Sequence, residues 1–179
     1  MFRLLRGFLA CLLVAISLAA PGVGAQPSSL GELHGRVIGV TDGDTIKVLD
    51  AAQDSHKIRL NGIDAPERSQ PYGRASTDHL KQYVAGKQVR VELVKYDRYG
   101  RLIGNVWVQP ADCADCGQTL FVNHAMVLAG MAWWYRYYAE DQDEEDRGRF
   151  ESAEQEALAR KRGLWADPDP VPPWVWRRR

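Results

Sequence analysis

Three short segments of this sequence combine carboxylates or arginines with residues typical of turns. They are Asp42-Gly43-Asp44-Thr45, residues 59–67 (RLNGIDAPE) and Asp97-Arg98-Tyr99-Gly100-Arg101. Each segment alone has an ordinary structural explanation, because Asp-Gly is a common hairpin turn and Asp-Ala-Pro-Glu can start a helix. In combination they hold the side chains that hydrolysis of a phosphodiester requires.

The chemistry of such a reaction assigns a distinct task to each residue type. A hard cation such as Ca²⁺ binds carboxylate and carbonyl oxygens, which Asp44, Asp64 and the backbone oxygen of Ala65 could supply. Attack on phosphorus needs a base to activate water, and Glu67 follows Asp64 by three residues. Charge that grows on the phosphoryl oxygens needs cations that can form two parallel hydrogen bonds. Arginines at positions 59 and 101 meet that need.

Short apolar runs that alternate with turn signals extend from Leu33 to Val108. The expected strands cover residues 36–40, 45–49, 57–60, 88–93 and 101–108. In the fourth run, for example, Val89, Val91 and Leu93 alternate with charged residues. Five short strands within about 75 residues predict a small antiparallel sheet or barrel.

Helical patterns interrupt and follow these strands. Helices are expected over residues 73–85, over residues 122–129 and in a third segment that carries Phe150, Ala153 and Ala157. The third segment follows an acidic run (140–146) and ends in Lys161-Arg162, which suits the helix dipole at both ends. Repeated prolines after Trp165 predict an extended tail over residues 166–179.

The order and spacing of these segments resemble the staphylococcal nuclease (thermonuclease) family along residues 33–165. The matching segments are Val40 to Thr45, Ile58-Arg59-Leu60, Ile63 to Glu67, Asp97 to Arg101, Val122-Asn123, Ala129 to Ala132 and Lys161 to Trp165. The resemblance implies an α+β fold with a mainly β core, namely an OB-fold five-stranded barrel with three helices. It also implies a Ca²⁺-dependent nuclease that acts on DNA and RNA and leaves 3′-phosphates, because the bond to the 5′-oxygen is broken.

The resemblance also implies roles for single residues. The family places Ca²⁺ ligands at the positions of Asp44 and Asp64 and a carbonyl ligand at that of Ala65, where a threonine is frequent. The position of Glu67 holds the base, or the residue that orients the attacking water. The two active-site arginines of the family fall on Arg59 and Arg101.

Further substrate contacts follow from the same resemblance. Arg98 replaces a family lysine that contacts a nucleotide phosphate, which keeps the charge but changes the geometry. Tyr99 matches a tyrosine near bound nucleotide. The aromatic run Trp133 to Tyr138 aligns less securely, so we assign it no individual roles; it suits either base stacking or the core and the wall of a subsite.

The first 25 residues have the pattern of a secretory signal peptide. Arg3 and Arg6 precede an apolar run from Phe8 to Ala20, and small residues lead to Ala25. A single-pass anchor is the alternative, although the run is short for a membrane span. We therefore expect an exported protein of the periplasm or the extracellular medium. We further expect a monomer without stable membrane association after cleavage.

Two cysteines remain once the leader is removed. Cys113 and Cys116 in an oxidising compartment predict one disulfide. A thiol-redox Cys-x-x-Cys motif is the alternative, but it would need to open a helix after a strand, and these cysteines lie among loop residues. A zinc site would need a second ligand pair.

Composition narrows the class of protein. With 45% hydrophobic and 26% charged residues, the chain is neither collagen, nor wholly disordered, nor a coiled coil. The formal net charge is zero, with 23 basic and 23 acidic residues, but six of the acidic residues lie within positions 140–146. The rest of the chain can therefore carry a locally basic face that binds nucleic acid, although the net charge is zero.

The alternative function is a non-catalytic OB-fold module that binds nucleic acid or protein. Such modules tend to lose the carboxylates or arginines that are present here.

Overall fold

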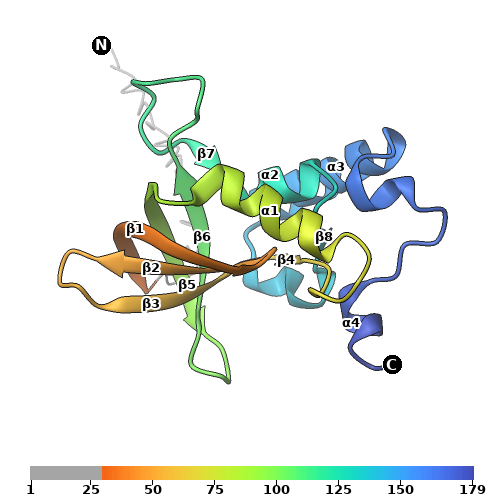
Figure 1. Ribbon diagram of the computed structural model, residues 1–179, viewed down its shortest axis with the longest axis horizontal. Helices are drawn as coiled ribbons and strands as arrows, with labels where there is room; N and C mark the ends of the chain where they lie inside the picture. Colours follow the sequence, from red (N-terminus) through yellow and green to blue (C-terminus); the bar gives the residue numbers. More distant parts are fainter. Residues whose placement is uncertain (1–29) are drawn as a thin grey trace, which may run out of the picture.

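A closed barrel of five strands forms the centre of the molecule, which a computed structural model describes over residues 30–179. The strands are β1 (Gly31–Asp42), β2 (Thr45–Asp50), β3 (Ser55–Leu60), β5 (Gln88–Tyr96) and β6 (Leu102–Val108). Antiparallel pairing gives the order β3-β2-β1-β5-β6, and a parallel pairing of β3 with β6 closes the barrel (Figure 1). This architecture confirms the predicted OB-fold barrel. The predicted signal peptide, residues 1–25, lies outside the described residues.

Alternating side chains fill the barrel as the sequence pattern predicts. In β6, Leu102, Gly104, Val106 and Val108 are buried, whereas the residues between them are partly exposed. Buried side chains of the neighbouring strands meet them; they include Val37, Ile46, Val48, Ile58, Leu60, Val89 and Val91. This apolar filling supports the turns at the ends of the strands, where the polar residues lie.

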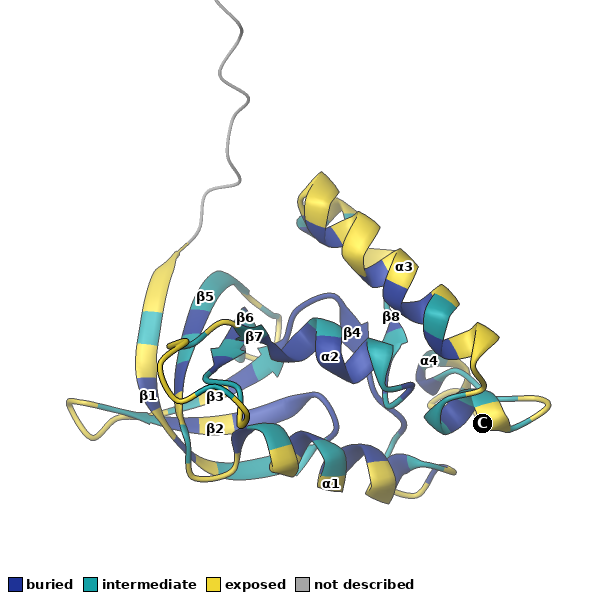
Figure 2. Cartoon of the chain, turned by 90° about the horizontal axis from the view of Figure 1, so that it is seen from above, coloured by how far each residue is buried: buried dark blue, intermediate teal, exposed yellow. Residues whose placement is uncertain are grey.

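Three longer helices pack against the barrel. They are α1 (Gly73–Val84), α2 (Val122–Leu128) and α3 (Glu144–Ala159). α1 contacts β1, whereas α2 lies between β6 and α3. Figure 2 shows α3 buried along one side and exposed along the other. Asp143 caps this helix by accepting a hydrogen bond from Asp146 N (2.7 Å), so the acidic run does precede and begin a helix.

Several very short elements connect these parts. β4 (Ile63–Asp64) pairs with β8 (Trp133–Trp134), and β7 (Leu120–Phe121) extends the barrel sheet beside β6. Two 3-10 helices, η1 (Arg136–Asp141) and η2 (Gly163–Ala166), precede and follow α3. The β4–β8 pairing fixes the backbone of Asp64 opposite Trp133.

The C-terminal tail differs from the extended segment that the prolines predicted. Residues 166–179 are not extended throughout, because η2 ends at Ala166 and a further helical turn, α4 (Pro173–Trp176), follows. Pro173 stands at the first helical position, where its missing N–H costs nothing and its fixed φ angle suits the helix. Pro173 is also buried, so the tail packs on the body of the protein.

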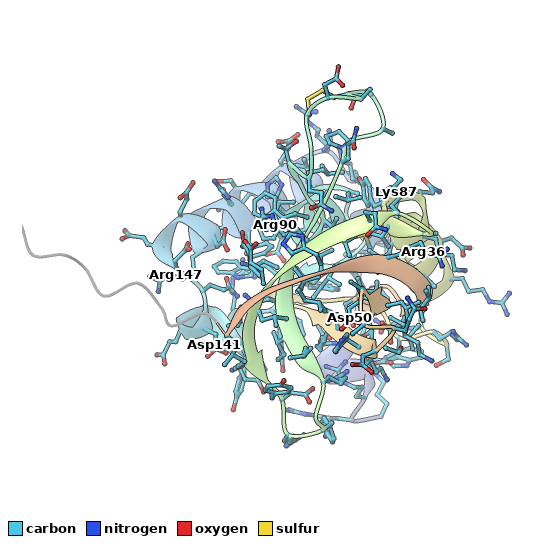
Figure 3. The ribbon with its side chains drawn as sticks, turned by 90° about the vertical axis from the view of Figure 1, so that its left-hand side faces the viewer. Arg36, Asp50, Lys87, Arg90, Asp141 and Arg147 are labelled. Carbon is cyan, nitrogen blue, oxygen red and sulfur yellow. A yellow bond between two sulfur atoms is a disulfide. The ribbon has the colours of Figure 1, made fainter. Side chains whose placement is uncertain are left out.

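A disulfide joins Cys113 and Cys116 in the loop between β6 and β7, with 5.5 Å between their Cα atoms. Figure 3 shows this bond at the tip of a loop that extends from the barrel. Among the described residues, no helix has the length and apolarity that crossing a membrane would require.

Candidate active site

The predicted site residues meet at one cavity of about 530 Å³. Its lining includes Asp44, Arg59, Ala65, Glu67, Arg98, Tyr99 and Arg101. They come from the β1–β2 turn, from β3, from the loop after β4 and from the β5–β6 turn. Asp64 is fully buried beside this cavity and is joined to it through Arg59. The fold thus brings together all eight residues predicted for catalysis, metal binding and substrate binding.

A tight turn presents Asp44 to the cavity. Asp42 pairs with Thr45, which leaves Gly43 and Asp44 as the loop of the hairpin. A Cβ atom on Gly43 would lie 1.9 Å from the hydroxyl oxygen of Ser76 in α1, so only glycine allows this close approach. Asp44 Oδ2 accepts a hydrogen bond from the backbone N–H of Ala65 (2.9 Å), which ties the turn to the loop after β4.

Arg59 bridges the two candidate metal ligands. Its Nη1 atom donates to Asp44 Oδ1 at 2.6 Å, and its Nη2 atom donates to Asp64 Oδ1 at 2.7 Å. Asp44 and Asp64 are 3% and 0% exposed, so two carboxylates share one guanidinium in a largely dry site. Such charge-assisted hydrogen bonds hold both carboxylates at fixed positions.

Burial and neighbouring charges act on these groups in opposite directions. Burial opposes ionisation of Asp44, but the Arg59 charge, the Ala65 N–H and the Thr45 hydroxyl outweigh it and hold the pKa of Asp44 below its usual value. For Asp64, burial and the nearby Asp44 charge prevail and raise the pKa. Burial lowers the pKa of Arg59, but the two carboxylates exceed that effect and raise it.

Glu67 lies on the loop that leads from β4 to α1. Its backbone N–H donates to Gln70 Oε1 (3.1 Å), and its carbonyl oxygen accepts from the Gln70 N–H (2.8 Å). These bonds close a short turn that directs Glu67 to the cavity. The side chain is 39% exposed, so water can reach it.

The β5–β6 turn is organised around Asp97. One carboxylate oxygen of Asp97 accepts from the backbone N–H groups of Tyr99 (2.8 Å) and Arg101 (2.9 Å), and the other accepts from Arg101 Nε (2.6 Å). Burial tends to raise the pKa of Asp97, but these donors on Arg101 and Tyr99 lower it. Asp97 therefore orients the Arg101 side chain toward the cavity. The Arg98 guanidinium lies 4.9 Å from the centre of the Tyr99 ring.

The cavity also contains residues that sequence reasoning did not assign to it. They are Asp42, Pro66, Lys95, Tyr96, Asp97, Ile103, Tyr135, Tyr138 and Arg177. Within the aromatic run, Trp134 is buried in the core, whereas Tyr135 and Tyr138 form part of the cavity wall. These positions agree with the interpretation of the run as core and subsite wall, and base stacking stays a prediction.

The donor set suits a weakly held hard cation. Asp44, Asp64 and the Ala65 carbonyl oxygen are the candidate ligands, and carboxylate and carbonyl oxygens are what Ca²⁺ prefers. In the part of the chain that the structure describes, no group of three or more His, Cys, Asp or Glu side chains could hold a metal ion by itself. Backbone oxygens and water would therefore complete the coordination of any cation here.

A five-stranded OB-type barrel with paired carboxylates, arginines and exposed tyrosines at one cavity defines a class of nucleic-acid hydrolases. Comparisons with known proteins agree. Residues 57–167 match the family model described as "Staphylococcal nuclease homologue". An "Uncharacterized endonuclease" of Escherichia coli is 46% identical over 153 residues, which covers 86% of this chain and 90% of that relative. A "Micrococcal nuclease" of Shigella flexneri is 37% identical over 147 residues, 82% of each chain.

An "Uncharacterized endonuclease" of Haemophilus influenzae is 38% identical over 143 residues, which covers 80% of this chain and 72% of that relative. The chain belongs to the staphylococcal nuclease family. Membership in a family of nucleases makes nucleic acids its class of substrate.

Proposed function

We propose that this chain is an exported, Ca²⁺-dependent endonuclease that hydrolyses DNA and RNA at the 5′-oxygen and leaves 3′-phosphates. The observation that carries the proposal is the convergence of Asp44, Arg59, Glu67 and Arg101 on one cavity, with Asp64 held behind them by Arg59. Two relatives that are named as endonucleases, from Escherichia coli and Haemophilus influenzae, support cleavage within a strand.

Each residue has one task in this reaction. Glu67 takes a proton from, or orients, the water that attacks phosphorus. Arg59 and Arg101 bind the phosphoryl oxygens, where negative charge increases as the bond to water forms and the bond to the 5′-oxygen breaks. Asp97 is a positioning residue, because it fixes Arg101 through the Nε atom and leaves the other guanidinium nitrogens for substrate.

Asp44, Asp64 and the backbone oxygen of Ala65 would hold Ca²⁺. When bound, this cation supplies positive charge beside the phosphoryl group and opposes the repulsion between the two buried carboxylates. A site with only two carboxylates predicts weak and reversible binding, since Ca²⁺ affinity increases with the number of charged ligands.

Basic and aromatic side chains would bind the rest of the strand. Lys95, Arg98 and Arg101 line the cavity near the β5–β6 turn, and Tyr99 is 68% exposed beside them. Cations that follow the phosphates and rings that stack on bases are sufficient for binding without strong sequence preference.

Degradation of single-stranded DNA and of RNA in Ca²⁺ and in EDTA tests this proposal. Cleavage should require Ca²⁺, disappear in EDTA and return with excess Ca²⁺. The DNA products should prime a polymerase only after phosphatase treatment, because a 3′-phosphate blocks extension. Binding without cleavage would instead support the non-catalytic OB-fold module.

Export has a separate test. The mass of protein recovered from the periplasm or the medium should correspond to a chain that begins at Gln26. It should also be lower by two hydrogens, because Cys113 and Cys116 are oxidised. A full-length chain in the membrane fraction would support the anchor instead, and free thiols would reopen the redox alternative.

A further inference from the structure

The C-terminal tail returns to the active site. After α3 and η2 it runs along the loop between β4 and α1, and α4 lies near that loop in Figure 1. Gln70 Nε2 donates to the backbone oxygen of Val171 at 2.5 Å. The Trp174 ring stacks on Tyr135 at a centroid distance of 5.2 Å and meets Trp133 edge-on at 5.7 Å. One hydrogen bond and two aromatic contacts thus hold the tail beside the cavity.

Arg177 extends from this tail into the cavity. Its guanidinium contacts both oxygens of Asp64, with Nη2–Oδ2 at 2.6 Å and Nη1–Oδ1 at 3.2 Å. The same Nη1 atom donates to Glu67 Oε1 at 2.7 Å. One arginine therefore contacts a candidate metal ligand and the candidate base.

These contacts use most of the hydrogen-bonding capacity of Asp64. A carboxylate has about four lone-pair positions, two on each oxygen. Oδ1 accepts from both Arg59 and Arg177, and Oδ2 accepts from Arg177. One position remains, and a guanidinium 2.6 Å from Oδ2 would repel a divalent cation placed next to it.

We propose that Arg177 is a tethered cation that occupies the divalent-cation site, so that docking of the tail and binding of the cation exclude each other. The inference rests on the proposed function, which assigns Asp64 to the cation and Glu67 to the water. Without metal, Arg177 compensates the buried charge of Asp64 and holds Glu67 in an ion pair. When the cation binds, the tail leaves, and Glu67 and the ring of Tyr135 become available to substrate.

The apparent Kd for the cation equals the intrinsic Kd divided by the fraction of molecules in which the tail is undocked. If it is docked in about nine molecules of ten, the apparent Kd for Ca²⁺ is raised about tenfold. The Arg177 side chain is 41% exposed, so solvent screens its ion pairs and keeps the docked state displaceable.

Calorimetric titration with Ca²⁺ alone measures this competition in the mature chain and three variants. Arg177→Ala should lower the Kd for Ca²⁺ about tenfold. Trp174→Ala keeps Arg177 but removes the stack on Tyr135, so its Kd should fall by a smaller factor. Arg178→Ala is the matched control, because it removes the same charge from an exposed neighbouring position and should leave the Kd within about twofold.

Hydrogen exchange of the C-terminal peptide gives a second readout. The amides of Val175 to Arg179 each donate within the tail, so release should speed their exchange when Ca²⁺ is added to the wild type. In Arg177→Ala the tail should exchange quickly with or without Ca²⁺.

The possible results separate this inference from the proposed function. Three results would overturn the competition and leave the proposed function intact. They are equal Ca²⁺ affinities in the wild type and Arg177→Ala, weaker Ca²⁺ binding in Arg177→Ala, and hydrogen exchange of the tail that Ca²⁺ does not change. Absence of Ca²⁺ binding in all four proteins would overturn the proposed Ca²⁺ dependence and the competition with it.

Discussion

Asn123 donates a hydrogen bond from Nδ2 to the main-chain oxygen of Asn61 at 2.9 Å, although 62 positions separate them. The same nitrogen donates to the Gly104 oxygen (3.2 Å), and Asn123 Oδ1 accepts from the Val106 N–H (2.9 Å). Asn123 is fully buried. One side chain of α2 thereby connects β6 to the turn that precedes Asp64.

Replacement of Asn123 by alanine should lower the free energy of unfolding by about 3 kcal/mol. The change leaves the Asn61 oxygen and the Val106 N–H in the core without the hydrogen bonds that Asn123 provides. Urea unfolding followed by circular dichroism measures the change. His124→Ala is the neighbouring control at a half-buried position and should cost roughly 1 kcal/mol or less. A loss of similar size in both variants would contradict a special role for Asn123.

The raised pKa of Asp146 predicts that the stability of the protein depends on pH. Burial, together with the charge of Asp143, raises the pKa of Asp146 from 3.8 to about 6. The unfolded chain therefore loses this proton near pH 4, whereas the folded chain keeps it to about pH 6. The stability that this proton contributes is complete below pH 4 and is lost as the pH rises through 6.

The Asp146→Asn variant isolates this effect, because other groups titrate equally in both proteins. Between pH 4 and pH 7 the wild type should lose roughly 1–3 kcal/mol of unfolding free energy relative to the variant. Urea unfolding at both pH values measures the difference. A constant difference between the two proteins would mean that Asp146 titrates normally.

Removal of either candidate metal ligand should abolish Ca²⁺-dependent cleavage. Asp44→Ala and Asp64→Ala each leave Arg59 with one carboxylate partner, so the fold and its circular dichroism spectrum should persist. Calorimetry should detect no Ca²⁺ binding in either variant. Full activity in one of them would remove that residue from the ligand set.

Glu67→Gln should separate catalysis from binding. The amide keeps the size of the side chain but cannot take a proton from water, so kcat should fall about 10²–10⁴-fold. Affinity for a nucleotide inhibitor, measured by calorimetry, should persist. Glu32→Gln, on β1 and outside the cavity lining, is the control and should cleave at the wild-type rate. An unchanged kcat in Glu67→Gln would exclude the proposed base.

The barrel could be predicted from the sequence because its signals are local. Alternation in β5 and β6 and the Asp42-Gly43 turn depend on neighbours within a few residues. The two-residue strands β4 and β8 could not be predicted in the same way, because each depends on a partner far along the chain. Their residues nevertheless determine where Asp64 lies.

The candidate site shows the same division. Asp44 and Arg59 were predicted because their turn and strand are locally encoded. Asp64, which lies on β4, was predicted because the family resemblance fixes its place in the order of the site residues. Arg177 was not predicted, since 113 residues separate it from Asp64 and a proline-rich tail carries no local signal for where it docks. Contacts of this kind depend on the finished surface of the protein.

The two arginines of the candidate active site allow the most direct test of the proposed mechanism. Arg59 holds Asp44 and Asp64 and is 16% exposed, whereas Arg101 is fixed by Asp97 and is 25% exposed. Lysine keeps the charge but cannot form two parallel hydrogen bonds to a phosphoryl group. Arg59→Lys and Arg101→Lys should therefore each reduce kcat about 10²–10³-fold, or ~3–4 kcal/mol, the usual size for a preorganised donor.

Inhibitor affinity decides how that loss arises. If the arginines act on charge that develops in the transition state, the affinity for a nucleotide inhibitor should change much less than kcat. Asp97→Ala should reduce kcat in the same way as Arg101→Lys but by a smaller factor. The variant keeps the Arg101 side chain and removes only the carboxylate that fixes it. Arg36→Lys, on β1 and outside the cavity lining, controls for the substitution itself. Wild-type rates in both active-site lysine variants would show that the proposed mechanism does not describe this protein.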